Sequence, residues 1–173
     1  MRAGGQQKIP RPSQWGKGSS APWIGRDFAP LQSLELVVAR IAAHTPQVAA
    51  TELMPEARAS AVLVNLYQGK NGVEVVLTKR AAHLKNHKGE ISFPGGRVEP
   101  DEQVHEAALR EAVEEVALPA HEVTLVGELD HLLTIVSNSY IIPVVGTLPY
   151  QPTLVASADE VDRVLHVPLH ELV

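Results

Sequence analysis

Cysteine is absent from this chain of 173 residues. Its absence excludes a disulfide framework, a thiolate metal site and a cysteine nucleophile. A chain without disulfides agrees with a reducing compartment, and we expect a cytoplasmic protein. Long apolar runs are also missing, since none approaches the roughly 20 residues that a membrane-spanning helix needs. No membrane partner is therefore expected.

Basic residues are scarce after the first 30 positions. Residues 1–30 contain five basic residues and one acidic residue, whereas residues 31–173 contain ten basic and 19 acidic residues. Affinity for nucleic acid depends on basic surface, so the acidic body argues against a nucleic-acid partner. It does not exclude a phosphorylated small molecule whose charge is neutralised by metal ions.

Composition divides the chain at about residue 30. Residues 1–30 are rich in glycine, proline, glutamine and serine, which predicts a flexible basic N-terminal arm. The arm lacks the apolar stretch of a secretory signal, and its prolines and glycines disfavour the amphipathic helix of an organellar transit peptide. Residues 31–173 are long enough for one domain with a substantial core.

Hydrophobic periodicity predicts helices and strands in that domain. Leu31–Ala43 has apolar residues at helical spacing. Residues 59–66 and 73–78 are β-rich runs, and the intervening Asn71-Gly72 is a strong hairpin signal. Further strands are predicted at 91–93, 122–134, 140–148 and 164–167, with a loop at 158–163.

The most informative segment runs from Gly96 to Leu118. Glu111, Glu114 and Glu115 are spaced i, i+3 and i+4, which places them on one face of a helix. Like charges at this spacing destabilise an exposed helix by roughly a few tenths of a kcal/mol per pair, so a cation is expected beside them. Converging carboxylates suit a hard divalent cation, Mg²⁺ or Mn²⁺.

The carboxylate helix should begin near Pro100 and end near Val116. Proline is favoured in the first turn, where Asp101 and Glu102 would lie near the positive end of the helix dipole. The buried stripe of the helix is predicted to comprise Val104, Ala108, Leu109, Ala112, Val113 and Val116.

The same segment resembles the Nudix box, G-x5-E-x7-R-E-U-x-E-E-x-G-U, in which U is a bulky aliphatic residue. The matching positions are Gly96, Glu102, Arg110, Glu111, Glu114, Glu115 and Leu118. Ala112 departs at the first U. Ala117 replaces the last glycine, which concerns how the helix ends, because glycine adopts the left-handed C-terminal conformation most easily. The resemblance implies an α/β protein, a Nudix-type α/β/α sandwich with a mixed β-sheet and a metal-binding helix at about 100–116.

A second motif precedes the box. The segment VLTKRAAHLKNHKGEISFPGG, residues 76–96, resembles the motif L-L-T-x-R-[SA]-x3-R-x3-G-x3-F-P-G-G of the coenzyme A pyrophosphatases in the Nudix superfamily. Val76 replaces the first leucine, and Lys85 replaces the second arginine, keeping the charge but losing the planar fork. Short segments at 128–134 and 143–146 resemble the same subfamily, so the likeness covers about residues 57–168.

The second resemblance implies the substrate. Coenzyme A or a derivative would be hydrolysed at its diphosphate to 3′,5′-ADP and 4′-phosphopantetheine, or the acyl form of the latter. A diphosphate that carries an additional 3′-phosphate needs several cations besides the metals. We predict Arg80, Lys85, Lys88 and Arg97 as substrate-binding residues; the alternative is that they are solvated loop charges.

Metal binding and catalysis are assigned to the carboxylates. Glu111 and Glu115 are the predicted metal ligands, and Glu114 is a ligand or the base that activates water. The resemblance adds the backbone carbonyl of Gly95 to the metal ligands. Glu160, on a predicted loop, lies where the family often supplies a general base; a surface turn is the alternative.

Glu102 and Arg110 are predicted to be structural. Glu102 would be a weaker ligand or the partner of Arg110, which orients the glutamates by ion pairing. The histidines show no metal-ligand spacing, because His83 and His87 at i and i+4 have no third ligand nearby.

Three alternatives stay open. The substrate can be another nucleoside diphosphate derivative, such as ADP-ribose, or a nucleoside triphosphate. The chain can be a non-catalytic ligand-binding Nudix domain, although such a domain would be expected to lose the box carboxylates. Coenzyme A pyrophosphatases generally continue beyond the strand at 164–167 with another strand and a C-terminal helix. The sequence stops before that segment, so two readings stay open: part of the sandwich or pocket rim is missing, or the N-terminal arm or a partner chain replaces it. A homodimer also stays open.

Overall fold

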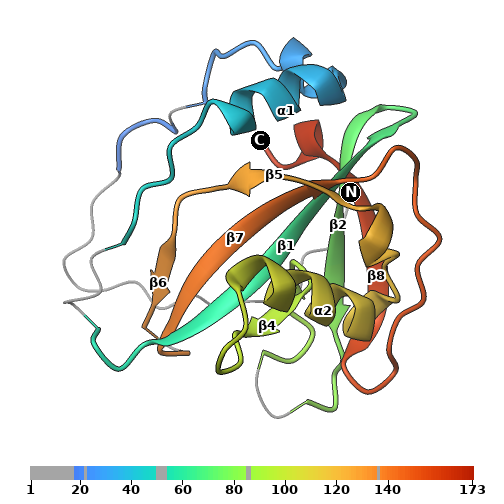
Figure 1. Cartoon of the computed structure of the whole chain (residues 1–173). Coiled ribbons are helices and arrows are strands. Elements are labelled where there is room, and N and C mark those ends of the chain that lie inside the picture. The colour runs from blue at the N-terminus through green and yellow to red at the C-terminus, as the bar shows by residue number, and fades with distance from the viewer. Residues whose placement is uncertain (1–17, 22, 50–53, 85–86, 136) are drawn as a thin grey trace.

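A mixed β-sheet forms the centre of the fold, with α2 on one face and α1 on the other (Figure 1). The computed structural model describes residues 18–21, 23–49, 54–84, 87–135 and 137–173. Most of the predicted N-terminal arm and Lys85 lie outside the described residues, and the division at residue 30 stays a prediction. In chain order the elements are η1 (Ala29–Gln32), α1 (Leu34–Ala42), β1 (Arg58–Gly69), β2 (Gly72–Arg80), β3 (Ile91–Ser92), β4 (Gly95–Arg97), α2 (Val104–Val116), η3 (Ala120–Glu122), β5 (Thr124–Glu128), β6 (Leu132–Thr134), β7 (Ser139–Thr147), β8 (Val161–Pro168) and η4 (Leu169–Glu171).

The strand order confirms the predicted mixed sheet. The main path is β3-β2-β1-β7-β5, with β4 paired to β1, β6 to β7 and β8 to β2. β1 and β7 are parallel, and the other pairs are antiparallel. The predicted β1–β2 hairpin is also confirmed. Its loop residues are Lys70 and Asn71, because Gly69 pairs with Gly72, whose φ of 108° suits glycine.

Each face of the sheet has its own apolar cluster. Successive residues of a strand point to opposite faces, so Leu63 of β1 packs under α2 whereas Val64 packs on the side of α1. Ala108 and Ala112 bring α2 close to β1, while Val37 anchors α1. The result is a two-sided sandwich in which α2 lies across β1 and β4 (Figure 1).

The start of the carboxylate helix differs from the prediction. α2 begins at Val104, so the predicted start near Pro100 is wrong. Asp101 has a left-handed φ of 68°, which a helix cannot continue through. The backbone N–H of Gln103 donates to the Glu106 side chain at 2.9 Å, which caps the first turn there.

The buried face of α2 also differs in part. Val113, predicted to be buried, is 45 % exposed, whereas Ala107 and Glu115 are buried. Glu111 lies against Gly96 of β4 and Glu115 lies beside Arg80 of β2, so two carboxylates of α2 face the sheet. Burial along α2 therefore reflects the site as well as the core.

The C-terminal end of α2 lies at Ala117, the position where the Nudix box has glycine. Ala117 is the C-cap residue and lies in the left-handed region, with φ 53° and ψ 40°. Its N–H still bonds to the carbonyls of Ala112 and Val113. An L-residue with a β-carbon is strained in this conformation, so Ala117 occupies a position that favours glycine.

Three other boundaries shift. The predicted helix at 31–43 is split by the cap residue Ser33, whose hydroxyl accepts a hydrogen bond from the N–H of Leu36. The strand predicted at 122–134 is interrupted, because residues 129–131 leave the sheet between β5 and β6. β8 begins at Val161 rather than at 164, because it pairs with β2 through a bulge beside Arg80. No helix among the described residues is long and apolar enough to cross a membrane.

Candidate active site

Two glycines of β4 let the carboxylate helix lie directly on the sheet. A β-carbon on Gly96 would come within 2.2 Å of Oε1 of Glu111. A β-carbon on Gly95 would come within 2.4 Å of the carbonyl oxygen of Ala61. The contact at Gly95 is with backbone and cannot be relieved, so that position requires glycine, whereas a β-carbon on Gly96 would displace the Glu111 side chain that lies against it.

Glu115 is the most buried of the helix carboxylates, with 2 % of the residue exposed. Its Oε1 lies 3.6 Å from Nη1 of Arg80, while its Oε2 has no hydrogen-bond partner among the described residues. Burial, together with the negative charges of Glu160 and Glu111, raises the pKa of Glu115 to about 7. The charge of Arg80 and a backbone hydrogen bond from Gly95 oppose this rise in pKa.

Arg110 is held by three carboxylates. Its Nε and Nη2 bind the two oxygens of Glu102 at 2.8 and 3.1 Å, the bidentate arrangement that suits guanidinium. Its Nη1 lies 3.0 Å from Glu111 and 3.3 Å from Glu114, and Nη2 also donates to the carbonyl of Arg97. The hydrogen bond from Arg110 lowers the pKa of Glu102. These contacts are the ones that an orienting arginine would make, and the role itself stays a prediction.

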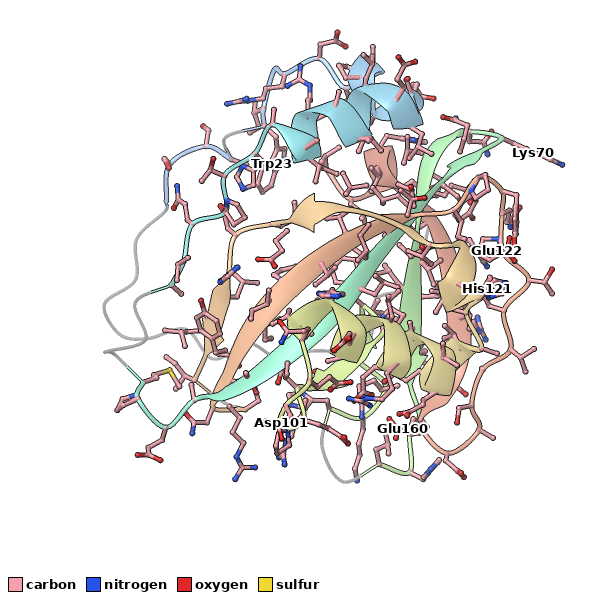
Figure 2. All side chains as sticks on the ribbon, in the orientation of Figure 1. Trp23, Lys70, Asp101, His121, Glu122 and Glu160 are labelled. Carbon is pink, nitrogen blue, oxygen red and sulfur yellow. The ribbon has the colours of Figure 1, made fainter. Side chains whose placement is uncertain are left out.

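The negative charge of Glu160 acts on Glu111. Burial raises the pKa of the half-buried Glu111 carboxyl, the hydrogen bond from Arg110 opposes that rise, and the charges of Glu114 and Glu160 add to it. Glu160 therefore lies close enough to repel carboxylates of α2, although it precedes β8 in the chain. Figure 2 shows Glu160 on the same side of the molecule as α2.

The loop that carries Glu160 is tied to the segment that carries Arg80. The N–H of Ala81 donates to the carbonyl of Glu160 at 2.9 Å. The ring of His83 bonds through Nε2 to the carbonyl of Asp159 at 3.0 Å. The sequence gives no sign of this contact, because His83 and Asp159 are 76 residues apart in the chain.

The predicted substrate cations are not equivalent. Arg80 points into the carboxylate cluster, and its Nε is buried without a partner among the described residues. Lys88 and Arg97 have exposed side chains, and Arg97 contributes its carbonyl to Arg110. Lys85 cannot be placed because it lies outside the described residues. Of the predicted cations that the structure describes, Arg80 alone is thus brought against the helix carboxylates.

The carboxylates fit a divalent cation by their chemistry. Among the described residues, no three acidic or histidine side chains are already gathered in a metal-binding arrangement. Glu111 and Glu114 turn toward Arg110 and Glu115 toward Arg80, because carboxylates that repel one another turn to the nearest cations. The unpartnered Oε2 of Glu115 is a buried acceptor in an all-oxygen site, which suits a hard cation.

A pocket that the sequence did not predict lies on the face of the sheet that carries α1. Its volume is about 460 Å³. Val64, Phe93 and Pro143 form part of its wall, and Arg40 and His44 reach it from the C-terminal turn of α1 and the residues after it. The remaining polar wall residue is Asp130, whose carboxylate lies 2.8 Å from Nε2 of His44.

A family model described as a NUDIX domain matches residues 57–172, more than half of the chain. The chain belongs to the Nudix family. Nudix hydrolases use divalent metal ions and act on small molecules that contain a diphosphate. The segment matched includes the carboxylates of α2, Arg80 and Glu160 described above.

Curated Nudix relatives resemble the chain over part of their length. Nudix hydrolase 3 from Caenorhabditis elegans is 37 % identical over 118 residues, covering 66 % of this chain and 49 % of the relative. An uncharacterized Nudix hydrolase, NudL, from Yersinia pestis is 42 % identical over 98 residues, covering 56 % of this chain and 49 % of the relative. The chain spans about half the length of the curated relatives it matches.

Solved Nudix structures confirm the fold. The crystal structure of a C. elegans Ap4A hydrolase binary complex aligns with a TM-score of 0.55 and 21 % identity, covering 65 % of this chain and 82 % of that one. RenU, a Nudix hydrolase from M. smegmatis, aligns with a TM-score of 0.58 and 21 % identity, covering 66 % and 73 %. At this identity the likeness concerns the fold alone.

Proposed function

We propose that the chain is a metal-dependent hydrolase of the diphosphate in coenzyme A or its derivatives. The products would be 3′,5′-ADP and 4′-phosphopantetheine, or the acyl form of the latter. The observation that carries the proposal is the pairing of Arg80 with Glu115, a donor and an acceptor that each keep one buried polar atom without a partner among the described residues. Such a pair suits a phosphate oxygen on one side and a cation on the other.

The narrower choice of coenzyme A depends on the segment that holds Arg80. Residues 76–96 match the coenzyme A pyrophosphatase motif at Arg80, Gly89 and the run Phe93-Pro94-Gly95-Gly96. In the structure this segment runs from β2 to β4, so one stretch supplies both the partly buried Arg80 and the glycines under α2. The spatial coincidence supports the motif as part of one site.

The carboxylates of α2 share one part in the proposed mechanism. Glu111, Glu115 and Glu114, with the carbonyl of Gly95, would hold the metal. When bound, Mg²⁺ or Mn²⁺ supplies positive charge to the phosphate oxygens and lowers the pKa of a bound water. Arg110 holds Glu111 and Glu114 in place.

Arg80 and Glu160 complete the proposed reaction. Arg80 donates from its guanidinium to an oxygen of the diphosphate, which stabilises the charge that develops as the bond to phosphorus breaks. Glu160 accepts a proton from the attacking water. Its carboxylate forms no hydrogen bond or ion pair with another described residue, whereas Glu114 is already bound to Arg110. An unengaged carboxylate beside the cluster is the better placed base.

A substrate panel tests the proposal. The purified full chain is assayed in Mg²⁺ and in Mn²⁺ against coenzyme A, acetyl coenzyme A, ADP-ribose, diadenosine tetraphosphate and a nucleoside triphosphate, with products identified by mass spectrometry. We expect the highest kcat/KM with coenzyme A or its acetyl form, with 3′,5′-ADP as a product. Preference for another compound would favour the alternative Nudix substrates, and tight binding without turnover would favour a ligand-binding domain.

A further inference from the structure

We propose that the pocket beside α1 binds the adenosine 3′-phosphate half of the substrate, and that Arg40 contacts the 3′-phosphate. This inference rests on the proposed function, because it names where one half of coenzyme A would lie. It concerns the face of the sheet opposite α2 and residues from outside the Nudix box.

The pocket and the carboxylate site share one short segment. Phe93 lines the pocket, and Gly95 lies two residues later against Glu115. Consecutive Cα atoms are 3.8 Å apart, so the two positions are within about 8 Å of each other. Coenzyme A with its diphosphate at Gly95 would pass Phe93 to place its adenosine half in the pocket.

The walls suit a flat ring. Apolar wall residues come from α1, from β1 and β7, and from the segments before β4 and after β5. They are Ile41, Val64, Pro143, Phe93 and Leu129. A volume of about 460 Å³ falls within the roughly 300–1,000 Å³ typical of small-molecule sites, which are mostly apolar with few polar groups. An adenine ring buries its faces against such walls.

The polar groups of the pocket suit an anion. Arg40 and His44 are four residues apart and reach the pocket together. His44 is already bound to Asp130, whereas the guanidinium of Arg40 forms no ion pair or hydrogen bond with the residues that the structure describes. Arg40 is thus a donor for an incoming phosphate, whose oxygens match its planar fork.

Charge also decides which half of coenzyme A fits. The pantetheine half carries no charge and two amides that need polar partners along an extended chain. The adenosine half combines a flat ring with a 3′-phosphate. Apolar walls with an unpaired arginine at one side match the second combination.

The test compares two substrates that differ only in the 3′-phosphate. Wild type, Arg40→Gln and Arg40→Lys are assayed with coenzyme A and with dephospho-coenzyme A, and titrated calorimetrically with 3′,5′-ADP and with 5′-AMP. Lys70→Gln is the matched control, because it removes one positive charge at the tip of the β1–β2 hairpin (Figure 2), and Lys70 does not line the pocket.

We expect Arg40→Gln to raise KM for coenzyme A about ten-fold and to weaken 3′,5′-ADP binding by a similar factor, since hydrogen bonds to charged groups are worth that much. Dephospho-coenzyme A and 5′-AMP should change less than about two-fold, and Arg40→Lys should fall between. Equal losses for both substrates, or no loss, would overturn the inference. If wild type hydrolyses neither compound, the proposed function is wrong. The titrations with 3′,5′-ADP and 5′-AMP then decide by themselves whether Arg40 binds the 3′-phosphate.

Discussion

Arg80 and Glu115 face each other at 3.6 Å from neighbouring elements, β2 and α2. Nε of Arg80 and Oε2 of Glu115 are both buried without a hydrogen-bond partner among the described residues. A buried polar atom left unpaired costs about 1–3 kcal/mol. Each residue of the pair can therefore bind a further group through the buried atom that their mutual contact does not use.

Removing the buried charge of Glu115 should abolish turnover. Glu115→Gln deletes the carboxylate charge while keeping the shape, and we expect activity to fall by at least about 100-fold, the scale for lost metal ligation. Circular dichroism should be unchanged. Glu171→Gln, an exposed change in η4, serves as the control. Full activity in Glu115→Gln would refute the assignment of Glu115 as a metal ligand.

Arg80 should respond to a conservative change. Arg80→Lys keeps the charge but loses the fork, so we expect KM for the preferred substrate to rise about ten-fold. Arg80→Ala should lose more, because it also leaves the Glu115 carboxylate without its cation. Steady-state kinetics checks both, with thermal unfolding to separate activity from stability. Unchanged kinetics in Arg80→Ala would show that Arg80 does not contact substrate.

Arg110 should act through the carboxylates. Arg110→Lys cannot bind Glu102 bidentately while also reaching Glu111. We expect the affinity for Mn²⁺, measured by calorimetric titration, to fall about 10-fold to 100-fold, the range seen when groups that orient metal ligands are changed. A variant with normal Mn²⁺ affinity and normal kcat would show that these ion pairs only stabilise the fold.

Stability without metal should depend on pH through Glu115. Its folded-state pKa of about 7 lies above its ordinary value of 4.5, so the protonated form is favoured in the folded state. The resulting stabilisation is complete below about pH 4.5 and is lost as pH rises through 7. The loss is on the order of 3 kcal/mol.

Urea unfolding in EDTA at pH 5 and pH 8 measures this loss. Glu115→Gln should be less sensitive to pH than wild type. Added Mg²⁺ should stabilise wild type more at pH 8 than at pH 5, because binding to the folded state favours the ionised carboxylate. The same pH dependence in wild type and Glu115→Gln would contradict the burial of an ionisable Glu115.

The end of α2 should be improved by glycine. Ala117 lies at φ 53°, where a β-carbon costs roughly 1 kcal/mol. We expect Ala117→Gly to raise the free energy of unfolding by about that amount, measured by urea denaturation. Ala39→Gly, in the exposed interior of α1, should lower it by about 1 kcal/mol. Destabilisation by both changes would mean that the left-handed conformation does not persist in solution.

Spacing along the chain was sufficient to predict the carboxylate helix, yet not the separate roles of its glutamates. Glu111, Glu114 and Glu115 lie on α2 as predicted, but Glu115 is buried while the Glu114 side chain is 59 % exposed. Glu115 lies against Arg80 of β2, whereas Glu114 contacts Arg110 of its own helix. The spacing within the helix does not show which neighbouring element each glutamate meets.

Contacts across long stretches of sequence were not predictable. The bond between His44 and Asp130 spans 86 residues, and that between His83 and Asp159 spans 76. The local sequence around each residue carries no signal of the contact. The residues meet only because of the order of β1, β2, β7 and β8 in the sheet. The pocket beside α1 was missed for the same reason.

Local sequence is therefore enough for the Nudix box and the hairpin, because helical spacing and turn chemistry are properties of about ten consecutive residues. Tertiary structure alone decides that Arg80 meets Glu115, that Glu160 approaches Glu111 and that Arg40 reaches the wall formed by Phe93. Those pairs come from different elements, and only the packing of both faces of one sheet brings them within the few ångströms over which charges and hydrogen bonds act.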